Sequence, residues 1–172
     1  MAGISLKTMS KTLRQKKIVR VMTNIPTLIS EGMSVFFISY PIEKKERDLI
    51  KKMFSLCGHC MEVKKEDAID AATAISGSGP GYLFYFAEQM ITSAKLMGFS
   101  EKDAMTIVQK TFRGATLLWE SQGNSPEVLR KQVSSPGGTT LAALEHFKSN
   151  KVDQTIKEGI KKAYKRAKEL SS

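Results

Sequence analysis

The sequence is poor in the residues that usually carry catalysis or bind metals. Among 172 residues there are two cysteines and two histidines, which leaves little material for a zinc site or a Ser-His-Asp triad. No apolar run approaches the roughly 18 residues of a membrane-spanning helix, and residues 1–7 lack the apolar core of a secretory signal. We therefore expect a cytoplasmic protein with no membrane partner, whose thiols sit in a reducing compartment.

Acidic residues are missing from the start of the chain, where Glu31 is the first. The whole chain has 27 Lys and Arg against 17 Asp and Glu, a formal net charge of +10. The basic residues are mostly Lys, mixed with acids and with few aromatics between them. This pattern is typical of solvated helix faces rather than of a nucleic-acid-binding stripe, so we predict no nucleic-acid partner.

The order of the expected elements changes near residue 65. The elements before that point are a short amphipathic helix over residues 5–17, strands near 18–22 and 33–39, a helix from Pro41 to about Leu56, and a strand near 59–63. This alternation is typical of an α/β fold, although the strands are too few for a complete doubly wound sheet. From residue 66 onward every segment looks helical, which predicts an all-α region.

The helix expected over residues 82–97 is apolar around most of its circumference. A helix of this kind must be buried, either in a large core or against another chain. Because the chain is small, we favour a partner chain and predict that this helix lies in an interface.

Cys57-Gly58-His59-Cys60 has the spacing of a dithiol centre. That chemistry needs the first cysteine at a helix N-terminus, where the dipole stabilises the thiolate. Cys57 is instead expected at the end of a helix. A zinc site would need two further ligands, and His59 and His146 are the only histidines. We therefore predict no metal site here.

Two glycine-rich segments remain, each with two interpretations. Residues 134–140, Ser-Ser-Pro-Gly-Gly-Thr-Thr, read as a turn that opens a helix, whose free N–H groups would suit a carboxylate or phosphate. Taken alone, an ordinary interhelical turn is the simpler interpretation. Residues 76–81, Ser-Gly-Ser-Gly-Pro-Gly, lack the Lys of a phosphate loop and follow no strand, which favours a turn between helices.

Three stretches together resemble the successive signatures of the pyrroline-5-carboxylate reductases. They are Val-Arg-Val-Met-Thr-Asn-Ile-Pro at 19–26, Ser-Gly-Ser-Gly-Pro-Gly-Tyr at 76–82 and Val-Ser-Ser-Pro-Gly-Gly-Thr-Thr at 133–140. The resemblance implies an α+β fold. A partial Rossmann-like α/β segment over residues 1–65, the C-terminal half of a dinucleotide-binding domain, precedes an all-α dimerisation and substrate-binding domain over residues 66–172. It also implies a homodimer or a higher homo-oligomer.

The resemblance further implies an oxidoreductase that reduces 1-pyrroline-5-carboxylate, a cyclic imino acid, to L-proline with NADPH or NADH, the final step of proline biosynthesis. By the matching motifs, the backbone N–H groups of Gly138, Thr139 and Thr140 would hold the substrate carboxylate. The hydroxyl of Thr140, the predicted catalytic group, would lie near the ring nitrogen. The residues predicted to line the cofactor are Asn24, Pro26, Ser78 and Gly79.

The start of the chain departs from the family, which opens with a strand and a glycine-rich turn for the cofactor pyrophosphate. Met1-Ala2-Gly3-Ile4 resembles the middle of the cofactor domain instead. This predicts an N-terminally truncated product or one half of a split enzyme, which binds NADPH poorly and turns over slowly or not at all. Two alternatives stay open, a non-catalytic helical dimerisation module and, more distantly, a dithiol exchange protein.

Overall fold

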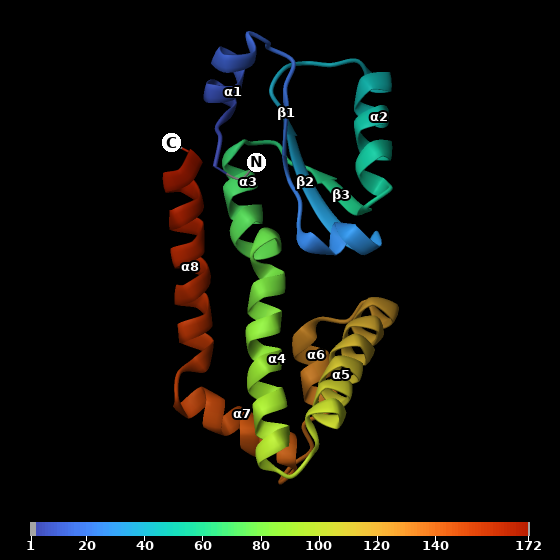
Figure 1. Ribbon diagram of the computed structural model, residues 1–172, viewed down its shortest axis with the longest axis vertical. Coiled ribbons are helices and arrows are strands. Elements are labelled where there is room, and N and C mark those ends of the chain that lie inside the picture. Colours follow the sequence, from blue (N-terminus) through green and yellow to red (C-terminus); the bar gives the residue numbers. More distant parts are fainter. Residues whose placement is uncertain (1–2, 172) are drawn as a thin grey trace. The chain divides into compact units, whose positions relative to one another are not determined.

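The computed structural model describes residues 3–171, so that Met1 and Ala2 of the opening tetrapeptide lie outside the described residues. Contacts between residues divide the chain into two compact units (Figure 1). Unit 1 comprises Met1–Tyr82 and Lys157–Ser172, and unit 2 comprises Leu83–Ile156. The expected domain boundary between residues 65 and 66 stays a prediction, because this division rests on a different criterion.

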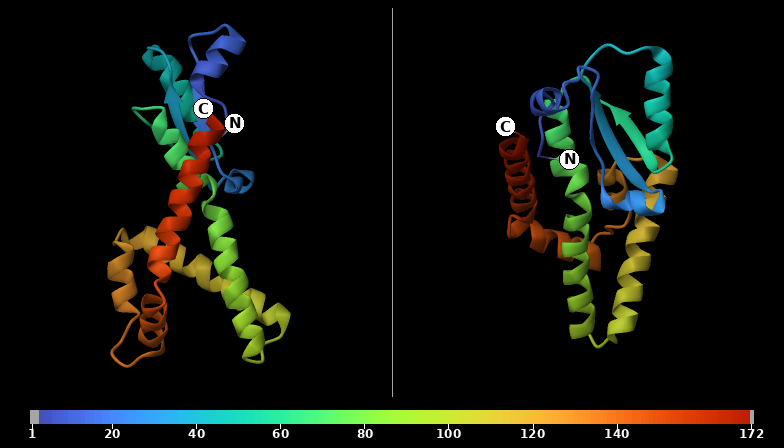
Figure 2. Two further views of the ribbon diagram at one scale, coloured as in Figure 1. Left: turned by 90° about the vertical axis from the view of Figure 1, so that its left-hand side faces the viewer. Right: turned by 45° about the horizontal axis from the view of Figure 1, so that its top comes forward.

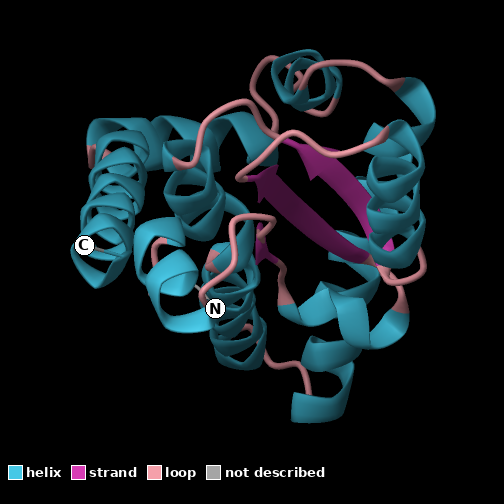
Figure 3. Cartoon of the chain, turned by 90° about the horizontal axis from the view of Figure 1, so that it is seen from above, coloured by secondary structure: helices cyan, strands magenta, loops and turns pink. Residues whose placement is uncertain are grey.

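Unit 1 is built on a three-stranded sheet, drawn in magenta in Figure 3. Its strands are β1 (Val19–Met22), β2 (Gly32–Ile38) and β3 (Gly58–Glu62), in the order β1-β2-β3. β1 pairs antiparallel with β2, whereas β3 runs parallel to β2. A parallel pair needs a crossover, and the helix α2 (Lys44–Ser55) provides it.

Helices cover both faces of this sheet. Phe54 of α2 packs against Phe36 of β2 with ring centroids 5.8 Å apart. Arg20 of β1 pairs in register with Phe37, the neighbour of Phe36, and therefore points to the opposite face. There its guanidinium reaches Asp70 of α3 (Asp67–Ala72). Figure 2 shows α2 alongside the sheet.

Two helices before β3 differ in their bounds from the sequence prediction. The first helix, α1 (Leu6–Leu13), begins after Ser5, whose Oγ accepts a hydrogen bond from the Thr8 N–H, and it is shorter than predicted. α2 begins at Lys44 rather than at Pro41. Glu43 and the third helical residue, Glu46, cap each other's backbone, and this capping box decides where the helix starts.

The turn predicted at residues 76–81 is wrong, because this segment is helical. η2 (Thr73–Gly77) is one turn of π-helix, in which the Ser78 N–H donates to the Thr73 carbonyl at 2.9 Å. It joins α3 directly to α4 (Gly79–Leu96), and Figure 1 shows the ribbon running through all three. Pro80 fits because the first turn of a helix needs no N–H donor there.

The remaining helices include two with the serine caps expected from their sequences. They are α5 (Glu101–Gln122), α6 (Pro126–Gln132), α7 (Thr139–Ser149) and α8 (Val152–Ser171). Ser100 caps α5 through the Asp103 N–H, and Ser125 caps α6 through the Val128 N–H. α8 returns the chain from unit 2 to unit 1. Within the described range, no helix is both long and apolar enough to cross a membrane.

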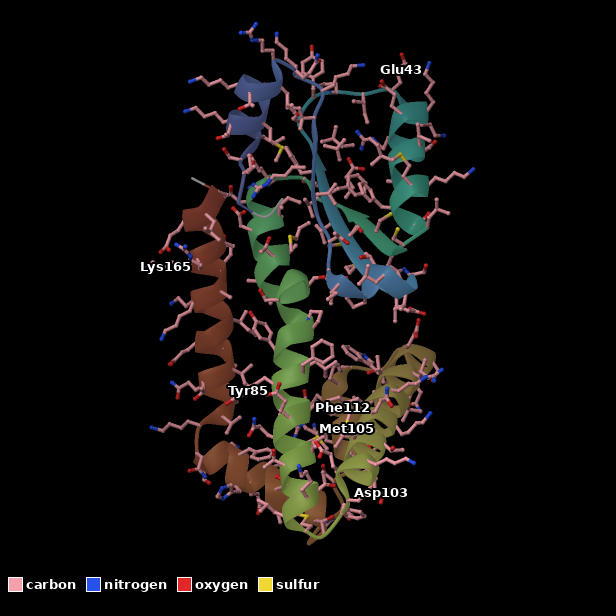
Figure 4. The ribbon with its side chains drawn as sticks, in the orientation of Figure 1. Glu43, Tyr85, Asp103, Met105, Phe112 and Lys165 are labelled. Atoms are coloured by element: carbon pink, nitrogen blue, oxygen red, sulfur yellow. The ribbon has the colours of Figure 1, made fainter. Side chains whose placement is uncertain are left out.

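The large apolar side chains of α4 are not buried within the chain. Tyr85 is 67% exposed and Phe84 57% exposed. Figure 4 shows Tyr85 on the side of α4 turned away from α5. On the other side Phe86 stacks on Phe112 of α5, with ring centroids 6.1 Å apart. One side of the apolar circumference of α4 therefore packs on α5, and the other side stays exposed within one chain.

Candidate functional site

The segment before α7 folds as a tight turn. The Gly138 N–H donates to the Ser135 carbonyl at 3.0 Å, across Pro136 and Gly137. Gly137 has a φ of 70°, which favours glycine, and Pro136 before it completes the pattern of a type II turn. A Cβ on Gly138 would press on the hydroxyl and carbonyl of Ser135. Both glycines are therefore required by the turn itself.

The N-terminus of α7 carries no side-chain cap. Its N-cap residue is Gly138, and no side-chain hydrogen bond is formed there. In the described part of the chain, the N–H groups of Thr139, Thr140 and Leu141 have no hydrogen-bond partner. These groups lie at the positive end of an 11-residue helix, which is a ready site for a small anion.

The available donors differ in one respect from those predicted. The N–H of Gly138 is used by the turn, so it is not offered to a ligand in this conformation. Leu141 takes its place as the third free donor, and the sequence motif alone did not identify it. The signal was present in the sequence, since the first three residues after an N-cap always lack helical acceptors.

Thr140 is the half-buried member of the pair Thr139–Thr140, while Thr139 is exposed. The hydroxyl of Thr140 forms no hydrogen bond to any residue that the structure describes. It is therefore free to donate to, or accept from, a bound molecule. Together with the three N–H groups it forms a compact polar cluster without a charged side chain.

The predicted cofactor residues lie at a corner of unit 1, and the structure brings two segments together there. Asn24 precedes the 3₁₀ helix η1 (Ile25–Ile29), which has Pro26 in its first turn. The Nδ2 of Asn24 donates to the carbonyl and to the hydroxyl of Ser76, both at 3.3 Å. Ser76 belongs to the π-turn η2, which is followed at once by Ser78 and Gly79. All four predicted residues therefore lie on two hydrogen-bonded segments.

Further contacts define the shape of this corner. Gly77 lies against Met22 so closely that a Cβ at Gly77 would collide with the end of the methionine side chain. On the other side of the turn, the Tyr82 hydroxyl donates to the Ala74 carbonyl at 3.0 Å. The Ser78 hydroxyl has no partner among residues 3–171. A nicotinamide ring would meet a small-residue surface with one free hydroxyl, so the residues fit that end of the cofactor.

The pyrophosphate end of a dinucleotide finds no such fit. A pyrophosphate normally lies at the N-terminus of the helix that follows the first strand of a dinucleotide-binding domain, behind a glycine-rich turn. Among residues 3–171, none of the three strands is followed by such a turn, although α2 follows β2 with an N-terminus of its own. That N-terminus is closed by its own acids, because the Glu43 N–H donates to Glu46 Oε2 at 2.8 Å. This hydrogen bond, followed by Lys17, lowers the pKa of Glu46, which holds it in the anionic form. Figure 4 shows Glu43 at the start of α2.

The two cysteines form no disulfide in this structure. Both are free, with Cys57 just before β3 and Cys60 within it. Cys57 lies in the turn that leads into the strand. The Cys60 Sγ instead donates to the Lys51 carbonyl at 3.5 Å. Nowhere in the described range do three His, Cys, Asp or Glu side chains gather as metal ligands would.

Comparison with known proteins gives consistent results. Residues 66–170, more than half of the chain, match the family model for pyrroline-5-carboxylate reductase dimerisation. A pyrroline-5-carboxylate reductase of Kluyveromyces lactis is 34% identical over 169 residues, which cover 98% of this chain and 58% of the relative.

Two solved structures share the fold. A pyrroline-5-carboxylate reductase from Coxiella burnetii superposes with a TM-score of 0.92 and 30% identity, over 99% of this chain and 63% of that one. A Plasmodium falciparum pyrroline carboxylate reductase with NADP bound gives a TM-score of 0.90 and 27% identity, over 99% of this chain and 68% of that one.

The chain therefore spans between 58% and 68% of the length of these three proteins. The α+β fold class, with a partial Rossmann-like segment and a helical domain, is confirmed by the likeness to the solved structures. Because the family match covers more than half of the chain and agrees with the three signatures, this chain belongs to the pyrroline-5-carboxylate reductase family.

Proposed function

We propose that this chain provides the substrate-binding and dimer-forming part of a pyrroline-5-carboxylate reductase, which reduces 1-pyrroline-5-carboxylate to L-proline with NADPH or NADH. The observation that carries the proposal is the uncapped N-terminus of α7 within the matched family region. It offers three aligned N–H groups to one carboxylate, the one anionic group that the substrate and the product share.

The N–H groups of Thr139, Thr140 and Leu141 would bind the substrate carboxylate, and the helix dipole would add to that interaction. The Thr140 hydroxyl would then orient the imine nitrogen or relay the proton that it takes up. Such positioning is the main contribution that a protein makes to a cofactor-driven reduction. We assign to Thr140 the catalytic role on this basis.

A bound nicotinamide would supply the hydride. Pro26, Ser78 and Gly79 would line its ring, because they surround the π-turn and its free hydroxyl. We expect weak NADPH affinity for the chain alone, since no strand among residues 3–171 is followed by a glycine-rich turn that would hold its pyrophosphate. Both cysteines are free, in keeping with the cytoplasmic location that we propose.

The partner that we propose is a second copy of the chain, joined through α4. The large side chains at the start of this helix are exposed, and Tyr85 is the most exposed aromatic among them. Monomeric proteins rarely leave an apolar patch of this extent in water. The match to a dimerisation family over residues 66–170 supports the same arrangement.

A second candidate function is a helical dimerisation module without catalysis. The described residues favour it, because none of their strands leads into a glycine-rich turn for a pyrophosphate. A cofactor titration separates the two candidates. A reductase part binds NADPH weakly but saturably, and a pure dimerisation module does not bind it.

The substrate site is tested by NMR titration with L-proline, with pyrrolidine as the control that lacks the carboxylate. We expect L-proline to shift the amide signals of Thr139, Thr140 and Leu141, and pyrrolidine to leave them unchanged. Imine-dependent NADPH oxidation is measured on the same preparation, with Thr140→Val as the variant that removes the hydroxyl. Unchanged α7 amides with saturating L-proline would contradict the proposed function.

A further inference from the structure

The side chain of Asn24 forms three hydrogen bonds within the chain. A carboxamide has two N–H donors and one carbonyl acceptor. The Nδ2 donors of Asn24 point at the carbonyl and the hydroxyl of Ser76, each at 3.3 Å. Its Oδ1 accepts from the backbone N–H of Met33 at 2.8 Å. Both ends of the Asn24 carboxamide therefore already have partners within the chain.

The orientation of this amide follows from its partners. The two ends of an Asn side chain are distinguished only by the hydrogen bonds that they form. The Met33 N–H can only donate, so the atom facing it must be the oxygen. The nitrogen then faces the Ser76 carbonyl, which can only accept. The oxygen and the nitrogen of the Asn24 carboxamide therefore indicate the same orientation. A flipped carboxamide would lose the hydrogen bonds to both the Met33 N–H and the Ser76 carbonyl.

What Asn24 holds is the π-turn. Asn24 and Ser76 are 52 residues apart in sequence, so this contact ties the end of β1 to η2. The turn itself is closed by the hydrogen bond from the Ser78 N–H to the Thr73 carbonyl. π-turns inside helices are rare and occur frequently at functional sites. Ser78, which follows this turn, carries the free hydroxyl of the corner.

We propose that Asn24 is a positioning residue, which fixes the π-turn so that the Ser78 hydroxyl, rather than Asn24 itself, binds the nicotinamide end of the cofactor. The inference rests on the proposed function for its ligand. It replaces the direct cofactor contact expected for Asn24 from the sequence motif. The hydrogen bonds of Asn24 are structural, and its effect on the ligand passes through the turn to Ser78.

A double-mutant cycle tests this pathway on the full chain, with NADPH affinity measured by fluorescence titration. Removal of the hydroxyl in Ser78→Ala weakens binding by about tenfold, as expected for one lost hydrogen bond. Asn24→Ala does the same by misplacing the turn. The double variant loses about tenfold in total, because Asn24 has nothing left to position. Additive losses, about a hundredfold in the double variant, would show a direct contact by Asn24 and overturn the proposal.

Hydrogen exchange of the Ser78 amide provides a test that needs no ligand. Asn24→Ala is expected to speed this exchange at least tenfold while the amides paired between β1 and β2 keep their rates. Thr27→Val is the matched control, because it removes only the bond from Thr27 Oγ1 to the Asn24 carbonyl in the same corner. An unchanged Ser78 rate in Asn24→Ala would overturn the proposal. If NADPH does not bind the parent chain but the exchange changes as expected, the cofactor part of the proposed function is wrong and the Ser78 hydroxyl loses its assigned ligand, while the positioning of the turn by Asn24 is confirmed.

Discussion

Unit 1 and unit 2 contrast in how they bury their apolar side chains. Unit 1 contains the fully buried Phe36 and Ile69, together with the buried Arg20. Among the described residues of unit 2, the buried apolar residues are only Ala104 and Val108. The aromatic side chains with the greatest exposed fractions, Tyr85 and Phe84, nevertheless lie in unit 2. The difference indicates that unit 1 is stabilised by its own core, whereas unit 2 needs surface from another molecule.

The two binding roles that we propose fall in different units, with the nicotinamide end of the cofactor at unit 1 and the substrate carboxylate at unit 2. The Asn24–Ser78 corner belongs to the unit that packs on itself, so it is held by internal bonds. The α7 site belongs to the unit that exposes α4 and α5. Assembly with a second copy would therefore determine how rigidly the carboxylate donors of α7 are held.

The buried ion pair of unit 1 is the most sensitive point. Arg20 is 1% exposed and its guanidinium lies 2.8 Å from Glu66 and 2.7 Å from Asp70. Arg20→Met leaves the Asp70 carboxylate buried without its cation, which costs roughly 3–5 kcal/mol of unfolding free energy. Urea unfolding followed by circular dichroism measures this loss.

The control for Arg20 is Lys17→Met, which removes an exposed partner of Glu46. It is expected to change stability by less than about 1 kcal/mol. A similar small change in Arg20→Met would show that unit 1 does not depend on its buried pair, and the contrast between the units would weaken.

Gly58 is the second point on which unit 1 depends. Its φ of 127° is unfavourable for any other residue, and a Cβ there would collide with the backbone of Gly32 on the neighbouring strand. Gly58→Ala is expected to cost about 3 kcal/mol, measured by the same urea titration. Gly159→Ala, on an exposed face of α8 with open space around it, should instead stabilise the chain by up to about 1 kcal/mol. Equal effects of the two changes would contradict this explanation.

Unit 2 is tested through its exposed helix. Tyr85→Arg places a charge on the side of α4 that we assign to the second copy. Burial of an unpaired charge should weaken self-association by about a hundredfold, measured by sedimentation equilibrium. Tyr40→Arg makes the same exchange at an exposed tyrosine of unit 1 and should leave association unchanged. If both variants associate like the parent chain, α4 is not the interface.

The smallest expected effect is the contribution of two exposed carboxylates, one in each unit, to the pH dependence of stability. The pKa of Glu46 is lowered by the Glu43 N–H and then by Lys17, and the pKa of Glu127 is lowered by Lys131. Because both folded-state values lie below the ordinary 4.5, each contributes stability at neutral pH that is lost as the pH falls through the folded pKa. Glu46→Gln and Glu127→Gln should therefore each be slightly less stable than the parent at pH 7. The differences should shrink as the pH falls below the ordinary 4.5 and close once it has passed through the lowered folded-state pKa values.

These two variants also sharpen the contrast between the units. Exposed pairs do not depend on the core around them, so both differences should shrink alike in molar salt. A difference that persists in acid, or that appears in one unit alone, would show that a carboxylate acts through packing rather than through charge.

Local signals in the sequence predicted most elements well. The apolar runs of β1 and β2 and the serine caps of α5 and α6 depend on neighbouring residues alone. The apolar circumference of α4 likewise predicted a surface that one chain leaves open. The turn that opens α7 was predicted for the same reason, because Pro136 and Gly137 dictate its backbone.

Features set by distant contacts were not predictable in this way. The π-turn at residues 73–77 is held by Asn24, 52 residues from its partner Ser76. The burial of Arg20 requires Asp70 on another element. The donor set at α7 differed by one residue, since the Gly138 N–H is used by the turn and Leu141 is free. These details arise from tertiary packing, which overrides the local preferences of the residues.

The mass of the parent chain in solution tests the central claim most directly, namely that unit 2 is completed by a second copy. Light scattering after size-exclusion chromatography at micromolar concentration should give at least twice the 19.1 kDa of one chain. A folded species of 19.1 kDa over the whole concentration range would contradict the account, because the exposed face of α4 would then have no partner.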